Sequence, residues 1–240
     1  MALLTLDRLS KSFGAIRVAD GLTCTLQEGD ALGVIGPNGA GKSSMFDLIG
    51  GDLRPDSGKV LLDGADITDY APFRRCRAGI GRTYQVPRPF SKMTVFENLL
   101  VPATFGSGKA EAETYEHCAA VLESTGLLKK ANVAAGSLTL LDLKRLELSR
   151  ALAQRPRLLL LDEIAGGLTE HEAKELVELI RQIHRAGTAI IWIEHVVHAL
   201  LAVVSRLLVI DFGAKVMEGD PAAVMESAEV KRIYMGIGVA

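Results

Sequence analysis

The stretch "ALGVIGPNGAGKSS", residues 31–44, constrains the fold more than any other part of the chain. An apolar run of strand character ends at Gly36, and Gly41, Lys42 and Ser43 then precede a segment of helical character. This spacing fits the phosphate-binding loop G-x-x-x-x-G-K-[ST]. In such a loop the glycines let backbone N–H groups turn inward around a phosphate, and the following helix N-terminus adds partial positive charge. A strand, this loop and a helix in that order predict an α/β fold.

The loop also predicts a ligand, a nucleoside triphosphate with its magnesium ion. Lys42 would reach the β- and γ-phosphates, and Ser43 would ligate Mg²⁺. A chance turn is the alternative, but the pattern should arise in only about one per cent of shuffled chains of this length. The expected ATP-binding residues of the loop are Gly36, Pro37, Asn38, Gly39, Ala40, Gly41, Lys42, Ser43 and Ser44.

An acidic pair follows a second apolar strand pattern. The segment "RLLLLDEI", residues 157–164, ends its apolar run at Asp162 and Glu163. In phosphate-loop nucleotidases such an aspartate holds the Mg²⁺ shell, and the glutamate can polarise the attacking water. The alternative is a strand that simply ends in two solvated acids. We favour the catalytic interpretation because the pair follows the loop by about the length of a nucleotide-binding domain.

The apolar pattern divides the chain into three stretches. Early segments are short, partly alternating and separated by glycine turns, which is typical of strands. Residues 94–153 contain three helix-like pieces with Gly and Pro breaks between them, which we interpret as an inserted helical lobe. Strand and helix then alternate up to "RLLVIDFG", which implies a parallel sheet. We expect one domain, residues 1–240, with a nucleotide-binding core and β subdomain at about 1–85 and 154–240 and a helical subdomain at about 86–153.

Charge and cysteine usage argue against several other classes. With 27 basic and 29 acidic residues and a net charge of -2, the chain has no general attraction to nucleic acid, and we expect no such partner. Cys24, Cys76 and Cys118 are odd in number, widely spaced and never paired as CxxC. They are therefore expected to be buried free thiols rather than disulfides or zinc ligands.

Membrane segments are not expected from the sequence. The N-terminal segment becomes charged at Asp7 and Arg8, too early for a secretory signal, so we expect the chain to stay in the cytoplasm. The most apolar stretch, residues 189–210, is interrupted by charged residues and histidines. Since a membrane span tolerates such groups poorly, we interpret it as strand, helix and strand.

In content and in order, these motifs resemble the nucleotide-binding subunit of an ABC transporter, and the resemblance covers essentially all 240 residues. It implies a P-loop NTPase (RecA-like) core with a parallel sheet, an N-terminal antiparallel β subdomain and an inserted α-helical subdomain. It also implies ATP hydrolysis, with ATP and Mg²⁺ as cofactors. Mg²⁺ would be ligated by Ser43, Gln85 and Asp162.

Three further site residues follow from the resemblance. Phe13 stands where the family has an aromatic ring that stacks on adenine, and a packed core Phe is the alternative. Gln85, in "GIGRTYQ", matches the glutamine of the loop that senses Mg²⁺ and the transmembrane partner, and a solvated amide is the alternative. His195, in "IIWIEH", matches the histidine that contacts the γ-phosphate. Together with Glu163, Gln85 and His195 are the expected catalytic residues.

Partners are implied in the same way. In the family two copies face each other, and each ATP lies between the phosphate-binding loop of one copy and the signature turn of the other. A second ATPase copy is therefore expected, as a homodimer or beside a paralogue. Transmembrane permease subunits and, indirectly, a periplasmic or extracellular solute-binding protein complete the assembly, which places the chain peripherally on the cytoplasmic face of the inner membrane.

Local segments narrow the transporter class. The segments "GIGRTYQ", "MTVFENLLVP", "AGGLTE", "GDPAAVM" and "VKRIYMG" look like those of ATPases from branched-chain amino-acid importers and their amide or urea relatives. The groove between Gln85 and the segment "VPRPFSKMTVF" would receive a short permease helix on an apolar surface. That surface is expected at Val86, Pro87, Phe90, Met93 and Phe96.

The chain departs from the family at three places. Ile164 replaces the usual proline, and Thr169 replaces the aspartate or asparagine of the loop that crosses the dimer interface. The signature turn LSxGQ aligns with "LTLLD", residues 138–142. We expect Thr139 and Asp142 to keep its place at the interface, with the contact weakened by the lost glycine and by the Asp142 charge unless a Lys or Mg²⁺ offsets that charge.

These departures leave other functions to weigh. A low-turnover nucleotide-binding regulatory partner in a heterodimeric ABC complex is favoured by the altered turn and opposed by the intact Glu163 and His195. A soluble ABC protein of translation or DNA repair usually carries two cassettes or long coiled coils, and this sequence has neither. The ATP-hydrolysing importer subunit remains the favoured prediction.

Overall fold

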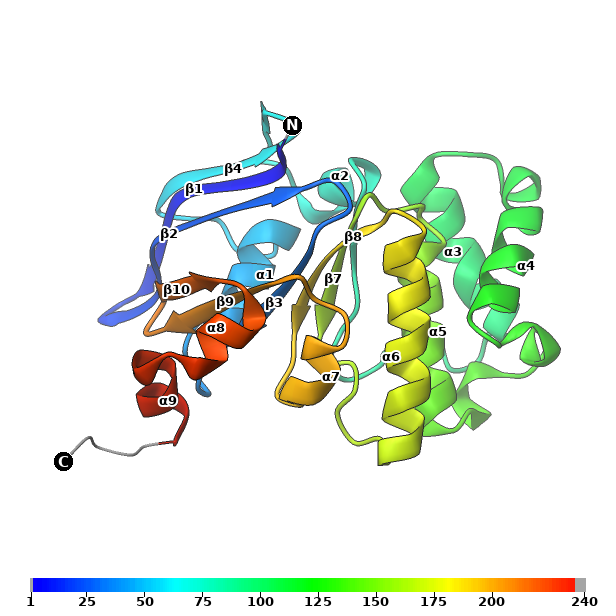
Figure 1. Cartoon of the computed structure of the whole chain (residues 1–240). Coiled ribbons are helices and arrows are strands. Elements are labelled where there is room, and N and C mark those ends of the chain that lie inside the picture. The colour runs from blue at the N-terminus through cyan, green and yellow to red at the C-terminus, as the bar shows by residue number, and fades with distance from the viewer. Residues whose placement is uncertain (1, 236–240) are drawn as a thin grey trace.

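The computed structural model describes residues 2–235, which form two sheets and several helical layers (Figure 1). Gly236, the last residue of the "VKRIYMG" segment, lies outside the described residues. The strands are β1 (Ala2–Phe13), β2 (Ile16–Gln27), β3 (Ala31–Ile35), β4 (Ser57–Leu62), β5 (Ala65–Asp66), β6 (Ile80–Arg82), β7 (Leu158–Asp162), β8 (Ala189–Ile193), β9 (Arg206–Asp211) and β10 (Ala214–Gly219).

The α-helices are interleaved with these strands. They are α1 (Lys42–Gly50), α2 (Pro72–Arg77), α3 (Val95–Ser107), α4 (Tyr115–Ser124), α5 (Leu140–Leu152), α6 (Glu170–Arg185), α7 (Val197–Leu201), α8 (Pro221–Glu226) and α9 (Ala228–Met235). Short 3-10 turns at Glu111–Thr114, Leu128–Lys130 and Ala135–Ser137 lie within the helical part.

The larger sheet has the strand order β10-β9-β3-β8-β7-β6 and is parallel except for β10 at its edge. Strands β3, β7 and β8 are buried at every position, as expected for parallel strands covered on both faces. Their side chains alternate between two cores. Leu158 and Leu160 face α1 and the antiparallel sheet, whereas Leu159 and Leu161 face α6 and α7.

The smaller sheet is antiparallel, with the order β2-β1-β4-β5. Its apolar residues share one core with Met45, Phe46 and Leu48 of α1 and with one face of the parallel sheet. Helix α1 therefore lies between the two sheets (Figure 1). The predicted α/β fold with a parallel sheet and an N-terminal antiparallel sheet is confirmed.

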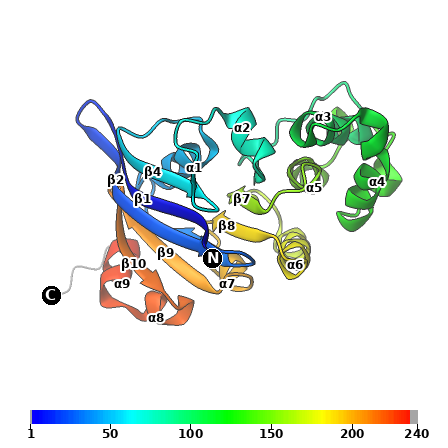
Figure 2. The same cartoon turned by 90° about the horizontal axis from the view of Figure 1, so that it is seen from above.

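Helices α3, α4 and α5 form a separate layer beside the parallel sheet (Figure 2). Their own core includes Val95, Leu99, Cys118 and Leu146. Helix α5 also contributes Leu148 to the core of the sheet, so α5 connects this layer with the sheet. The arrangement agrees with an inserted helical lobe, while the exact subdomain bounds stay a prediction.

Two smaller predictions are confirmed and one needs a correction. Residues 189–210 fold as strand, helix and strand, and no described helix combines the length and apolar character needed to cross a bilayer. All three cysteines are free thiols, with Cys24 and Cys118 buried. Cys76 is only partly buried, because it lines a cavity between α2 and the helical layer.

Candidate functional site

The phosphate-binding loop joins β3 to α1, and its backbone leaves room only for glycine at two positions. A Cβ atom on Gly36 would lie 2.1 Å from the carbonyl oxygen of Ile210. Gly41 has a φ of 102°, and a Cβ there would lie 2.3 Å from the carbonyl oxygen of Val18. Both sites therefore exclude any side chain, which explains why the motif needs these two glycines.

Lys42 is folded back over the loop that precedes it. Its ammonium group donates to the carbonyl oxygens of Gly36 at 2.8 Å and Pro37 at 2.9 Å. Burial lowers the pKa of Lys42, and the nearby carboxylates of Glu163 and Asp162 oppose that shift. The lysine thus lies in the electrostatic field of the acidic pair, where a phosphate placed in the loop would meet it.

Three side chains meet at the carboxyl ends of neighbouring strands. Glu163 follows β7, and its Oε2 accepts a hydrogen bond from Gln85 Nε2 at 2.5 Å. Its Oε1 lies 2.8 Å from Nε2 of His195, which comes after β8. Strands β6, β7 and β8 are adjacent and parallel, so their carboxyl ends reach the same sheet edge. The structure therefore brings together Glu163, Gln85 and His195, which lie far apart in the sequence.

Asp162 ends β7 just before this group. Burial raises the pKa of Asp162, and the guanidinium group of Arg82 opposes the shift. The hydroxyl of Ser43, the amide of Gln85 and this carboxylate are hard oxygen donors of the kind that Mg²⁺ prefers. Among residues 2–235 no group of three or more His, Cys, Asp or Glu side chains is arranged to hold a metal ion. The donor set fits magnesium held jointly with nucleotide phosphate rather than a closed protein cage.

Phe13 ends β1 with 51% of its surface exposed, which excludes the alternative of a packed core side chain. The ammonium group of Lys11 lies 5.4 Å from the ring centre. The ring is free to stack on a planar group, and its role toward adenine stays a prediction.

The turn at residues 138–142 is closed by its own side chains. The hydroxyl of Thr139 accepts a hydrogen bond from the backbone N–H of Asp142 at 3.3 Å and donates to Oδ2 of the same residue at 2.9 Å. Asp142 is 5% exposed, and Lys130 forms an ion pair with it. A lysine therefore offsets the added negative charge, which is the condition under which the sequence analysis expected that charge not to weaken the contact.

Thr169 and Ile164, the two other departures from the family pattern, also have local structural roles. Thr169 forms a capping box at the start of α6, in which its hydroxyl accepts from the N–H of Glu172 at 3.3 Å and Glu172 accepts from the N–H of Thr169 at 2.9 Å. Ile164 is fully buried in the core beneath α6. Both substitutions thus contribute to packing or capping in this chain.

Sequence reasoning missed a helix face that holds the segment around Gln85. Lys144, a buried residue of α5, donates to the carbonyl oxygen of Gln85 at 2.6 Å. Three residues later, Glu147 forms an ion pair with Arg150 at 3.0 Å, and Arg150 donates to the carbonyl oxygen of Arg88 at 2.9 Å. The regular i, i+3 spacing of charged residues in α5 was the available signal.

Glu194 was also missed, although it directly precedes His195. It is 1% exposed and accepts hydrogen bonds from the backbone N–H groups of Ala165 at 2.8 Å, His195 at 2.9 Å and Val196 at 3.3 Å. A buried carboxylate with several backbone donors fixes the loop that carries it. Glu194 therefore holds His195 opposite Glu163.

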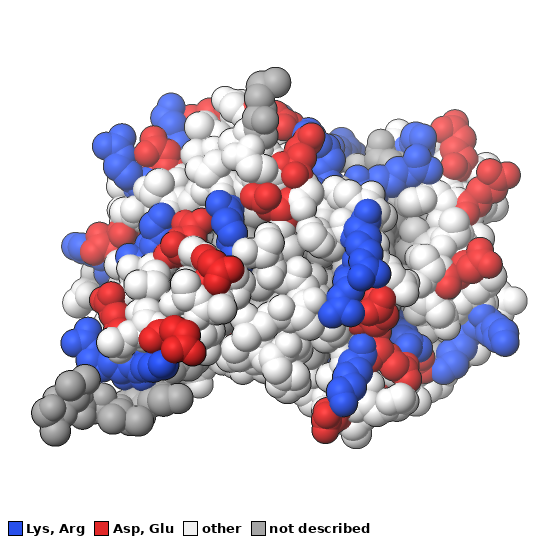
Figure 3. Space-filling model, in the orientation of Figure 1, with Lys and Arg blue, Asp and Glu red and all other residues white. Residues whose placement is uncertain are grey.

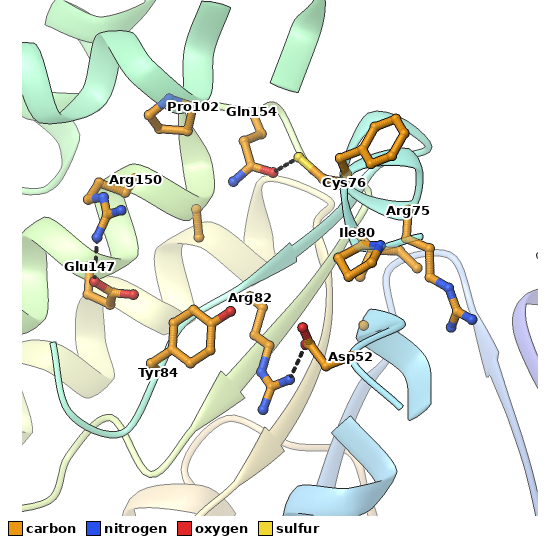
Figure 4. Close-up of a pocket in the computed structure, with 14 residues that line it drawn as sticks. Asp52, Arg75, Cys76, Ile80, Arg82, Tyr84, Pro102, Glu147, Arg150 and Gln154 are labelled. Atoms are coloured by element: carbon orange, nitrogen blue, oxygen red, sulfur yellow. Dashed lines mark hydrogen bonds and ion pairs between the residues drawn. The ribbon is translucent and has the colours of Figure 1, made fainter. Parts of the chain in front are cut away.

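A cavity of about 270 Å³ lies between α1, α2 and the helical layer (Figure 4). Its lining residues are Gly50, Asp52, Pro72, Phe73, Arg75, Cys76, Ile80, Arg82, Tyr84, Pro102, Glu147, Arg150, Ala151 and Gln154. None of the five residues expected to form the docking surface lines it, although Val86 and Phe90 are exposed. The expected surface thus lies beside this cavity rather than in it.

Charged residues of both signs are mixed on the face of the molecule seen in Figure 3. No single-sign patch dominates that face, in keeping with the small net charge of -2.

Comparison with known proteins agrees with this geometry. The family model described as ABC transporter matches residues 19–166. The chain is 33% identical to the high-affinity branched-chain amino acid transport ATP-binding protein LivG of Escherichia coli, over 98% of each chain. It is 32% identical to the corresponding protein BraF of Pseudomonas aeruginosa, again over 98% of each.

Solved structures give the same result. An ATP-binding cassette of an ABC transporter in its ADP conformation superposes with a TM-score of 0.90 at 30% identity, covering 99% of this chain and 100% of the other. A nucleotide-free ATP-binding cassette from an ABC transporter gives a TM-score of 0.89 at 29% identity, covering 100% of both chains.

Proposed function

The chain belongs to the ABC transporter family of ATP-binding proteins, and from this premise we propose that it is the ATP-hydrolysing subunit of an importer for branched-chain amino acids or related small solutes. The names of its relatives support the solute class. The permease and solute-binding subunits would contact the solute, while this chain supplies the energy.

The hydrogen bonds of Glu163 to Gln85 and His195 are the observation that carries the proposal. Each carboxylate oxygen accepts one of these bonds and keeps a further lone pair. Glu163 would use one to accept a proton from the attacking water, and His195 would hold that carboxylate in position and reach toward the γ-phosphate. The short links among the three residues would let one bound phosphate organise all of them.

The phosphate-binding loop would hold the ATP whose γ-phosphate is attacked by the water that Glu163 activates. Its backbone N–H groups would surround the β-phosphate, and Lys42 would exchange its bonds to the Gly36 and Pro37 carbonyls for phosphate oxygens. Ser43, Gln85 and Asp162 would hold Mg²⁺, which neutralises charge that develops on the phosphates. Phe13, on the neighbouring sheet, would stack on the base.

A second ATPase copy and a permease are the proposed partners. The cavity beside Arg82 would receive a short cytoplasmic helix of the permease, because exposed aromatic side chains line it: Phe73 is 59% and Tyr84 is 44% exposed. One wall is the segment that also carries Gln85, so a docked helix would lie next to a residue bonded to Glu163. This arrangement would place the chain at the cytoplasmic side of the membrane, with the solute-binding protein reached through the permease. The helical segment, about residues 86–153, would act as a subdomain at this contact.

The proposal is tested by identifying the permease that co-purifies with the chain and reconstituting both in proteoliposomes. We expect ATP-dependent uptake of leucine, isoleucine or valine when the matching solute-binding protein is supplied. Uptake of amides or urea alone would reassign the solute, and a complex without ATP-dependent uptake of any of these would contradict the proposed function.

Docking is tested separately with two matched double variants. Phe73→Glu with Tyr84→Glu should break co-purification with the permease and leave ATP binding intact. Phe90→Glu with Met93→Glu changes the surface expected from the sequence and should have the smaller effect. The reverse order of effects would move the docking site from the cavity to that surface.

A further inference from the structure

Arg82 is placed between the ATP site and the cavity. It ends β6 opposite Leu160 of β7, and Asp162 follows two residues later on the same face of that strand. Both side chains therefore lie on the side of the sheet that α1 covers. Arg82 also lines the cavity, where Figure 4 shows it bonded to Asp52.

The guanidinium group of Arg82 is shared by three carboxylates. Its Nη1 donates to Asp47 Oδ1 at 2.7 Å and to Asp52 Oδ2 at 3.1 Å, and its Nη2 lies 3.5 Å from Asp162 Oδ2. The side chain of Arg82 is only 12% exposed. One largely buried cation thus serves three acids, and it cannot satisfy all of them equally.

The contacts of the Arg82 guanidinium group with its three acids differ in length and in exposure. The bond to Asp162 is the longest, and the buried Nε of Arg82 has no hydrogen-bond partner among the described residues. Asp52 is the most exposed of the three acids, with 45% of its side chain accessible at the cavity, against 10% for Asp162. The ring centres of Phe46 and Tyr84 lie 5.8 Å and 5.1 Å from the guanidinium carbon, so both rings contact the centre of the group.

We propose that Arg82 is a positioning residue that couples the cavity to the ATP site by dividing its guanidinium group between Asp52 and Asp162. The proposal rests on the proposed function, because it takes Asp162 as a metal ligand and the cavity as the docking place. A docked cation that draws Asp52 away leaves more of the guanidinium group for Asp162 and weakens the hold of Asp162 on a metal ion. A docked acceptor that draws Arg82 toward the cavity does the opposite.

Asp52→Asn removes the charge of Asp52 and so imitates, without any permease, a docked cation that draws Asp52 away from Arg82. Binding of Mn²⁺, a paramagnetic substitute for Mg²⁺, is measured by electron paramagnetic resonance on the full chain with a non-hydrolysable ATP analogue. We expect Asp52→Asn to raise the Mn²⁺ dissociation constant about fivefold, a size typical of coupled neighbouring residues. In an Arg82→Met background, the same change should have an effect below about twofold, because no guanidinium group remains to be redistributed.

Measuring Asp52→Asn with and without Arg82 separates coupling through Arg82 from a direct effect of the Asp52 charge on Mn²⁺ binding. If Asp52→Asn weakens Mn²⁺ binding equally with and without Arg82, the Asp52 charge acts through space and the coupling proposal fails. Asp69→Asn is the matched control, because this carboxylate is paired with Arg54 and does not line the cavity; it should leave Mn²⁺ binding unchanged.

A second background keeps the test decisive if Arg82→Met does not fold. Arg82→Lys keeps the charge but places it on one nitrogen, whereas Arg82 reaches Asp52 through Nη1 and Asp162 through Nη2, so the Asp52→Asn effect should again fall below about twofold. A full fivefold effect in Arg82→Lys would overturn the sharing mechanism. A wild-type chain that binds neither the ATP analogue nor Mn²⁺ would instead contradict the proposed function.

Discussion

Two helices of this chain are expected to face ATP phosphate, and their N-termini are built in opposite ways. Helix α1 begins after Gly41, with no side-chain cap, no acid in its first turn and Lys42 at its first position. Helix α5 begins after Thr139, whose hydroxyl caps it, and carries Asp142 in its first turn. The N–H groups of α1 are left for a ligand, whereas α5 supplies an internal acceptor for one of its own.

The contrast between α1 and α5 implies that the two halves of an ATP site can change independently. In the proposed dimer, α1 acts on the ATP of its own copy and α5 on the ATP of the opposite copy. The Lys130–Asp142 ion pair and the Thr139 cap stabilise α5 without any phosphate. The chain would therefore keep the α1 half of its own ATP site intact while offering a weaker contact to its partner's site.

The largest effect is expected on ATP affinity, at the uncapped N-terminus of α1. Lys42→Ala should lower ATP affinity by about a thousandfold, because charged hydrogen bonds contribute about 1.5–3 kcal/mol each and at least two would be lost. The measurement is equilibrium binding of a fluorescent ATP analogue. Lys130→Ala removes the lysine that serves α5 and should leave the chain's own ATP affinity unchanged. Equal losses in the two variants would mean that the helix ends do not differ in this way.

The next largest effect concerns chemistry rather than binding. Glu163→Gln should slow hydrolysis by at least about a hundredfold, the lower range for loss of a general base, while ATP still binds. Turnover is measured by phosphate release at saturating ATP. Glu170→Gln, which changes an exposed acid at the start of α6, is the control and should not slow it. Retained turnover in Glu163→Gln would point to another base, with His195 as the first to test.

Restoring the glycine of the turn at residues 138–142 tests directly whether α5 makes a weakened contact with the partner's ATP. Leu141→Gly with Asp142→Gln should raise the ATPase rate of the pure chain about tenfold, since one restored backbone donor to an oxyanion is typically worth at least that much. The double variant also leaves Lys130 without its ion-pair partner, so its folding is checked by thermal melting. A fast wild-type chain that gains nothing from the repair would show that the substituted turn is neutral and that a paralogue partner is not needed.

The smallest effect concerns stability. Thr139→Ala should lower the free energy of unfolding by about 1 kcal/mol, because the backbone N–H of Asp142 loses its acceptor. Thr139→Gly should cost less, since glycine is itself a tolerated N-cap. Denaturant melts of both variants give the measurement. No change in either would mean that the hydroxyl does not support α5 and is free for another role.

The contiguous parts of the candidate site were predicted from the sequence alone. The phosphate-binding loop, Asp162 with Glu163, and His195 at a strand end were all predicted, along with the α/β class and the helical lobe. These features depend on the backbone geometry of a few consecutive residues, which is why their spacing is readable in one dimension. The altered turn was also located from its place ahead of the basic helix, although not the way its charge is balanced.

The tertiary structure alone decided which distant side chains meet. The contacts of Arg82 with Asp162, of Lys144 with the Gln85 carbonyl, and of Lys130 with Asp142 join elements from different strands, helices and loops. Strand order and helix packing set these neighbours, and the local sequence pattern does not encode either one. The docking prediction remains untested, and the cavity could not be predicted for the same reason: exposed apolar residues are visible in a sequence, but a cavity exists only where separate elements leave a space between them.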